Sequence, residues 1–107
     1  MIKKEEMPLC DVATTVQLVG SKWKLLIIKE LISGSKRTSQ LKRSLAGVSQ
    51  KVLTESLSSM IEDGLVNRIE LKKVPPHVEY QLTALGESFL PVIETMGQWG
   101  KYYKSQL

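Results

Sequence analysis

Four polar side chains follow one another at helical spacing in the middle of the chain. They are Gln50, Lys51, Thr54 and Ser58, and residues three or four apart share one face of an α-helix. Glutamine can bond an adenine edge at two points, lysine reaches guanine acceptors, and the threonine methyl can touch a thymine methyl. The pattern therefore predicts a helix that reads base edges in DNA. Taken alone, it fits a serine-rich surface helix about equally well.

Basic residues gather just before this helix. Residues 35–54 hold five basic side chains and no acidic one, so this window carries +5 while the whole 107-residue chain carries +4. Such clustering indicates a polyanionic partner. Phosphate contacts, which fix register without reading sequence, are predicted for Lys22, Arg37, Ser39, Lys42, Arg43 and Ser49. The alternative for each lysine is a solvated surface charge, and for Lys24 this alternative is the favoured interpretation.

The base-reading residues need a helix anchored at both ends. An apolar face is formed by Leu53, Leu57, Met60 and Ile61, with Ser49 as N-cap and Gly64 as the left-handed residue beyond the end. A shorter helix from Gln40 to Leu45, capped by Thr38 or Ser39, is expected to precede it. Two helices joined by the turn at 46–48 predict a helix-turn-helix over residues 38–64.

A β-hairpin is expected next, over residues 65–82. Apolar and polar residues alternate in 66–72 and 77–82, and Pro75 and Pro76 enforce a stiff tip between them. A hairpin placed directly after a recognition helix is called a wing. Its basic residues Lys72, Lys73 and His77 are predicted to reach the flanking minor groove or backbone, and a metal role for the lone His77 is disfavoured.

Helices flank this central part on both sides. One is expected from about Cys10 to Gly20, and a nearly all-apolar core helix from Ser21 to about Ser33, with residues 1–9 as a flexible arm. Residues 83–106 predict a C-terminal helical region, capped by Thr83 and kinked at Pro91. Its apolar stripe of Met96, Trp99 and Tyr103 exceeds what a small core needs and indicates an interface. The chain is thus predicted to be one mainly α domain with a small β-hairpin (α+β).

Cys10 stands where a helix is expected to begin. The helix dipole favours its thiolate form there, whereas Asp11 and the pair Glu5 and Glu6 oppose it. A reactive thiol and an inert structural cysteine are about equally supported. A single cysteine excludes an internal disulfide and fits a reducing cytoplasm.

Other function classes find little support. One Cys and one His stand far apart, and neither a glycine-rich phosphate loop nor a recognisable pair of catalytic acids is present, so no enzyme, cofactor or metal is expected. The longest apolar run, Leu25 to Ile28, is too short for a membrane span, and no signal peptide is expected.

Several motifs occur in a family-specific order. They read SKWKLLI at 21–27, VSQKVLT at 48–54, EDGLV at 62–66, VPPHVEYQLT at 74–83 and LG at 85–86. From about Cys10 to Gly100 the chain resembles the HxlR-type family of small bacterial winged-helix regulators, relatives of the MarR group. It differs from the usual pattern at Asp11, where proline is common, at Thr38, where an aromatic residue is frequent, and at Ser58, where arginine often stands.

The resemblance implies a dimeric DNA-binding regulator with helices at both termini in the dimer contact, which would place Val12 and Val16 there. It also implies electrophile or oxidant sensing in several members through an N-terminal cysteine, a position that Cys10 matches. The predicted function is a sequence-specific homodimeric regulator on a pseudo-palindromic operator in double-stranded DNA, with a small-molecule or oxidant effector. The alternative is a winged-helix module that mediates protein contacts without reading DNA.

Overall fold

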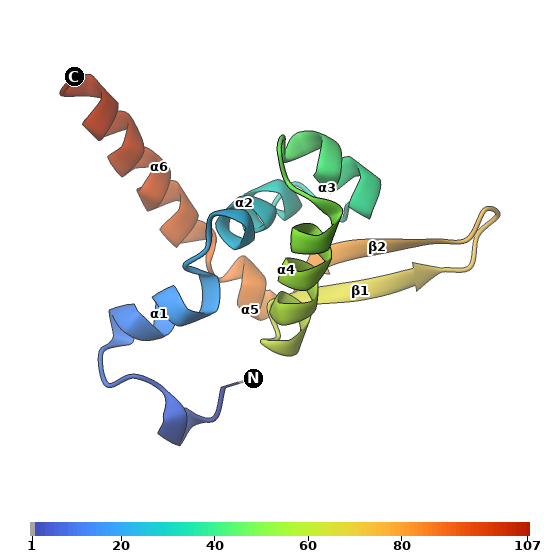
Figure 1. The fold of residues 1–107 in the computed structure, drawn as a ribbon, viewed down its shortest axis with the longest axis horizontal. Coiled ribbons are helices and arrows are strands. Elements are labelled where there is room, and N and C mark those ends of the chain that lie inside the picture. The colour runs from blue at the N-terminus through green and yellow to red at the C-terminus, as the bar shows by residue number, and fades with distance from the viewer. Residues whose placement is uncertain (1) are drawn as a thin grey trace.

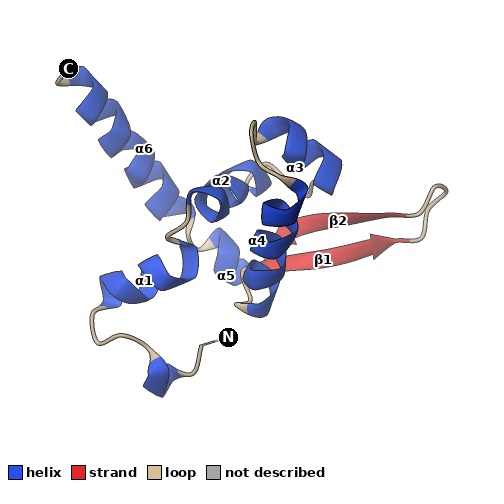
Figure 2. Cartoon of the chain, in the orientation of Figure 1, coloured by secondary structure: helices blue, strands red, loops and turns tan. Residues whose placement is uncertain are grey.

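The computed structural model describes residues 2–107 and shows six α-helices, one 3-10 turn and one hairpin within that range (Figure 1). In chain order these are η1 (Lys4–Glu6), α1 (Asp11–Val19), α2 (Lys22–Leu31), α3 (Thr38–Ser44), α4 (Gln50–Glu62), β1 (Val66–Leu71), β2 (His77–Leu82), α5 (Ala84–Glu87) and α6 (Leu90–Ser105). Figure 2 shows the single hairpin against an otherwise helical chain, which confirms the predicted α+β class. Met1, part of the predicted flexible arm, lies outside the described residues.

The core forms around α2, as the apolar sequence of that helix predicts. Ile27 and Ile28 are fully buried, and side chains from α3, α4 and the base of the hairpin close over them. Trp23 is half-buried and packs against this cluster. Burial of this apolar surface supplies the main driving force for folding and fixes α3, α4 and the hairpin relative to one another.

The helix α4 buries its predicted apolar face with one change. Leu53, Leu57 and Met60 are buried, but Ile61 is 36% exposed and Ser56 is buried instead. Positions 53, 56, 57 and 60 follow the i, i+3, i+4, i+7 rule, and Ile61 falls at the edge of that stripe. Ile61, predicted to belong to the apolar face, thus lies at the margin of the core.

Both ends of α4 are capped as predicted. The Ser49 hydroxyl accepts from the Val52 N–H at 3.1 Å. At the other end Gly64 has φ +77°, its N–H donates to the Ile61 carbonyl, and the Leu65 N–H donates to the Met60 carbonyl at 2.9 Å. This pair of bonds is a Schellman motif, and it turns the chain directly from α4 into β1.

The hairpin pairs Val66 with Leu82 and Leu71 with His77, within the range predicted for the wing. One further strand-like contact was not predicted. Lys36, in the connection from α2 to α3, exchanges two backbone hydrogen bonds with Tyr80 at 2.9 and 2.8 Å. The wing is thus joined to the segment that leads into the helix-turn-helix.

The helix boundaries differ from the prediction in two places. The helix α3 begins at Thr38 with Arg37 as N-cap, so neither Thr38 nor Ser39 is the cap; the Arg37 N–H donates instead to Gln40 Oε1 at 2.8 Å. The C-terminal region is two helices and not one kinked helix, since Pro91 lies in the first turn of α6, where a missing N–H costs no helical bond. Thr83 caps α5 as predicted.

The helices α1 and α6 lie at the periphery of the central domain. In Figure 1, α6 projects away from it on the side opposite the hairpin tip, and α1 lies near the base of α6. No side chain of α6 is buried. Residues 2–107 contain no helix that is long and apolar enough to cross a membrane.

Candidate nucleic-acid interface

The four predicted base-reading side chains lie on the exposed face of α4. Gln50, Lys51, Thr54 and Ser58 are all exposed, and α4 presents them on the side away from the core. Gln50 Nε2 donates to Thr54 Oγ1 at 3.3 Å. This bond restrains the glutamine amide, which would otherwise lose more rotamer freedom when it binds a base edge.

The predicted phosphate contacts surround this face. Ser39, Lys42 and Arg43 are exposed on α3, and Arg37 is exposed at its start. Ser49 uses an oxygen lone pair of its hydroxyl for the cap, which leaves the hydroxyl proton for a phosphate oxygen. Helix-turn-helix geometry thus places Lys42, Arg43 and Lys51 of the basic window on the two helices that would face a duplex, with Arg37 at the start of α3.

Two lysines of α2 have partners that the sequence did not indicate. Lys22 Nζ lies 4.6 Å from the centre of the Trp23 ring, a cation–π contact, and the side chain stays exposed. Lys24 Nζ donates to Ser59 Oγ on α4 at 2.8 Å in a partly buried site. The interpretation of Lys24 as a solvated surface charge was therefore wrong, because this lysine ties α2 to the recognition helix.

In the wing, Lys72 and Lys73 are exposed near the tip, whereas His77 turns inward. His77 Nε2 lies 2.8 Å from Glu79 Oε2, with only 15% of the histidine side chain exposed. Ser35 donates to the other carboxylate oxygen, Glu79 Oε1, at 2.6 Å. The Ser35 hydroxyl, and next the His77 ring, lower the pKa of Glu79, as expected when the charged form receives hydrogen bonds.

We call Ser35, Lys36, His77, Glu79 and Tyr80 the wing anchor. Two backbone bonds between Lys36 and Tyr80 and the side-chain bond from Ser35 to Glu79 connect the α2–α3 segment to β2, and the His77 ring holds the Glu79 carboxylate from within β2. The anchor sets the orientation of the hairpin relative to α3 and α4. A nearby exposed pair, Arg68 with Glu70 at 2.6 Å, lies within β1 alone and anchors nothing.

The predicted interface residues of the terminal helices are exposed in the single chain. On α1, Val12 and Val16 are 71% and 59% exposed. Met96, Trp99 and Tyr103 on α6 are also exposed, and the Trp99 and Tyr103 rings stack with centroids 5.5 Å apart. An apolar stripe of this length on a projecting helix is unfavourable in water unless another surface covers it.

Cys10 is the N-cap residue of α1 and is exposed. Its carbonyl accepts from the Thr14 N–H at 3.1 Å, so the backbone holds the thiol at the start of the helix. Within residues 2–107, no three His, Cys, Asp or Glu side chains gather as metal ligands would.

Comparison with known proteins agrees with this geometry. Residues 18–107 match the family model described as HxlR-like helix-turn-helix. YkvN of Bacillus subtilis, named as an uncharacterised HTH-type transcriptional regulator, is 43% identical over 97 residues, which span 91% of this chain and 82% of YkvN.

Two solved structures are similar in fold as well as in sequence. The HTH-type regulator ytcD is 38% identical and has a TM-score of 0.85, over 91% of this chain and 99% of its own. The redox regulator HypR in its oxidized form is 35% identical with a TM-score of 0.82, over 87% of this chain and 96% of its own. These relatives are named as regulators and not as enzymes. The chain belongs to the HxlR-like helix-turn-helix family of transcriptional regulators.

Proposed function

We propose that this protein binds a specific sequence in double-stranded DNA as a homodimer and regulates transcription from that site. The observation that carries the proposal is the exposed polar face of α4 beside the acid-free basic window of residues 35–54. A helix-turn-helix places such a face in the major groove, where each base pair presents a distinct pattern of donors and acceptors.

The side chains divide into two groups by their reach. Gln50, Lys51, Thr54 and Ser58 would contact base edges. The residues proposed to contact phosphates are Lys22, Arg37, Ser39, Lys42, Arg43 and Ser49, with Lys72 and Lys73 of the wing at the flanking backbone or minor groove. His77 is left out of this group because its ring is engaged by Glu79.

Dimer formation would follow from the apolar surfaces of the terminal helices. Val12, Val16, Met96, Trp99 and Tyr103 are the residues proposed to lie in the contact. A two-fold axis through it would set two recognition helices about one DNA turn apart and so favour a pseudo-palindromic operator. Light scattering should report a dimer at micromolar concentration, and a monomer would remove the basis for the two-half-site geometry.

Selection of binding sites tests sequence reading directly. Randomised duplexes, or fragments of the genome that encodes the protein, are retained on the full chain and sequenced. We expect a motif with two related half-sites. Recovery of no motif at moderate salt would favour the alternative, a winged-helix module for protein contacts. The basic window without acidic residues is the observation that argues against this alternative.

A second proposal concerns regulation through Cys10. The thiol is exposed at the start of α1, next to the proposed dimer contact, and the similar protein HypR is named a redox regulator. In a reducing cytoplasm Cys10 would remain a thiol until an oxidant acts. Because the chain has one cysteine, oxidation would then form a disulfide between Cys10 and either Cys10 of another subunit or a small-molecule thiol.

Operator binding before and after diamide, in wild type and Cys10→Ser, tests this role. A disulfide would move α1 against its partner and change the spacing of the recognition helices, so wild type should lose affinity and Cys10→Ser should not. Equal release by both proteins, or no response by either, would make Cys10 a structural residue.

A further inference from the structure

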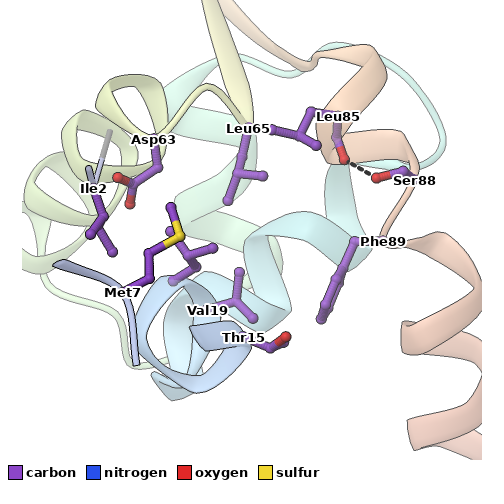
Figure 3. A pocket seen from close by; sticks show the side chains of 10 residues that line it. Ile2, Met7, Thr15, Val19, Asp63, Leu65, Leu85, Ser88 and Phe89 are labelled. Atoms are coloured by element: carbon purple, nitrogen blue, oxygen red, sulfur yellow. Dashed lines mark hydrogen bonds between the residues drawn. The ribbon is translucent and has the colours of Figure 1, made fainter. Parts of the chain in front are cut away.

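An apolar pocket lies where the N-terminal segment, α1, the turn after α4, and α5 meet (Figure 3). Its volume is about 180 Å³. It is lined by Leu18 of α1, Leu65 of the turn between α4 and β1, and Phe89 between α5 and α6. Met7 closes it from the N-terminal side (Figure 3). None of the residues proposed to contact DNA or the second subunit lines this pocket.

The size and lining of the pocket select a class of ligand. An apolar cavity of about 150 Å³ stays free of water and takes up a molecule such as benzene, whereas drug-sized ligands need about 300 Å³ or more. The space therefore suits a molecule with a single ring. The unbranched thioether of Met7 can adapt to the outline of such a guest.

One charged group adds selectivity. The Asp63 side chain points toward Met7 and Ile2 at the edge of the pocket (Figure 3). A carboxylate there accepts hydrogen bonds, attracts a cation and repels an anion. A ring that carries an amine or a hydroxyl should therefore enter more readily than the same ring with a carboxylate.

The pocket also touches the parts whose relative positions would control DNA binding. Asp63 and Leu65 flank Gly64, which follows the end of α4 and turns the chain into β1. Phe89 immediately precedes α6, and Leu18 belongs to α1. A guest wedged among them would bias the angle between the terminal helices and the helix-turn-helix.

We propose that this pocket is an effector site for a small single-ring molecule with a neutral or cationic donor group, and that its occupancy changes DNA affinity. The regulatory half of this inference rests on the proposed function, whereas the binding half does not. By linkage, a ligand that alters DNA affinity by some factor must have its own affinity altered by the same factor when DNA is bound.

Three probes with one ring and different charges test the site: benzylamine, benzyl alcohol and benzoate. Binding to the full chain is measured by ligand-observed NMR and by the shift in the thermal unfolding midpoint. Benzylamine and benzyl alcohol should bind, and benzoate should bind about tenfold more weakly or worse, the order expected from one like charge at a partly exposed site. Failure of all three to bind would overturn the proposal.

Two variants locate the binding. Leu85 lines the pocket but is half exposed, so Leu85→Trp can fill the space from outside and should abolish binding of all three probes. Asp63→Asn should remove the discrimination against benzoate, and Glu87→Gln, on α5 outside the lining, should keep it. Unchanged binding by Leu85→Trp would place the probes elsewhere and refute the site.

DNA binding is then measured with and without saturating benzylamine, at constant salt. A severalfold change in wild type that is absent in Leu85→Trp supports the effector role, and no change refutes it. If the protein bound no DNA under any condition, the proposed function would fail, while the NMR measurement would still decide whether the pocket binds the probes. A light-scattering shift from dimer to monomer on Leu85→Trp would show that a second subunit occupies the pocket and would overturn the proposal.

Discussion

Replacing Glu79 by glutamine should weaken DNA binding, although the change removes a negative charge from the vicinity of proposed phosphate contacts. Glu79 is close enough to Arg37 for the guanidinium to lower its pKa, after the larger effects of Ser35 and His77. Charge alone therefore predicts tighter binding of Glu79→Gln to a polyanion. The wing anchor predicts the opposite sign.

The size of the effect follows from the bonds that are weakened. The anchor joins the α2–α3 segment to β2 by two backbone bonds, between Lys36 and Tyr80, and by the side-chain bond from Ser35 to the Glu79 carboxylate, whose other oxygen contacts the His77 ring within β2. A glutamine amide is uncharged, so the bond that it accepts from Ser35 lacks the added strength of a bond to a carboxylate. A weakening equal to about one net hydrogen bond lowers the equilibrium constant for the oriented wing by roughly 3- to 10-fold, and DNA affinity should fall by no more than that.

Fluorescence anisotropy with labelled operator DNA measures this change, and Glu70→Gln is the matched control. Glu70 is an exposed acid on the same hairpin, but it is bonded only to Arg68 within β1. Electrostatics predicts the same gain for both variants, whereas the anchor predicts a loss for Glu79→Gln alone. Equal or tighter binding by Glu79→Gln would refute the positioning role of Glu79.

Three further outcomes are expected. Gln50→Ala should relax the preference at particular bases at a cost of about 1–3 kcal/mol, and an unchanged selected motif would count against a base-reading role. Arg43→Ala should weaken all sequences alike and reduce the salt slope by about one unit, which a salt titration on operator and random DNA would show. The pKa of Glu79 is lowered in the folded chain, so its stabilising effect is present above the unfolded value of about 4.3 and is lost as pH falls through the folded value. Thermal unfolding midpoints of wild type and Glu79→Gln should accordingly differ at pH 7 and converge as pH falls below the folded pKa of Glu79, and a constant difference would contradict this account.

Features set by neighbouring residues were predicted well from the sequence. The Ser49 cap and the turn at Gly64 depend on residues within a few positions of each other, so their signals are present in the sequence itself. The strand alternation in 77–82 gave the bounds of β2 for the same reason. The helical spacing from Leu85 to Trp99 was misleading because it continues across Ser88 and Phe89, where the helix actually breaks.

The contacts that position the site were not predictable in this way. Lys24 bonds to a serine 35 positions away, and Ser35 bonds to a carboxylate 44 positions away. No periodicity marks such pairs, since they exist only after the helices and hairpin pack together. The exposed faces of α3 and α4 were foreseen, but the wing anchor that orients the hairpin beside them required the structure.

The central claim, sequence-specific binding to duplex DNA, is tested most directly by affinity as a function of salt on two duplexes of equal length, one selected and one scrambled. Neutralising about four to eight phosphates per dimer should give log K a slope near −0.9 per phosphate against log salt. The account predicts such a slope on both duplexes, with the selected one bound at least about 1,000-fold more tightly throughout. Equal affinity for the two duplexes, with a slope near zero, would contradict it.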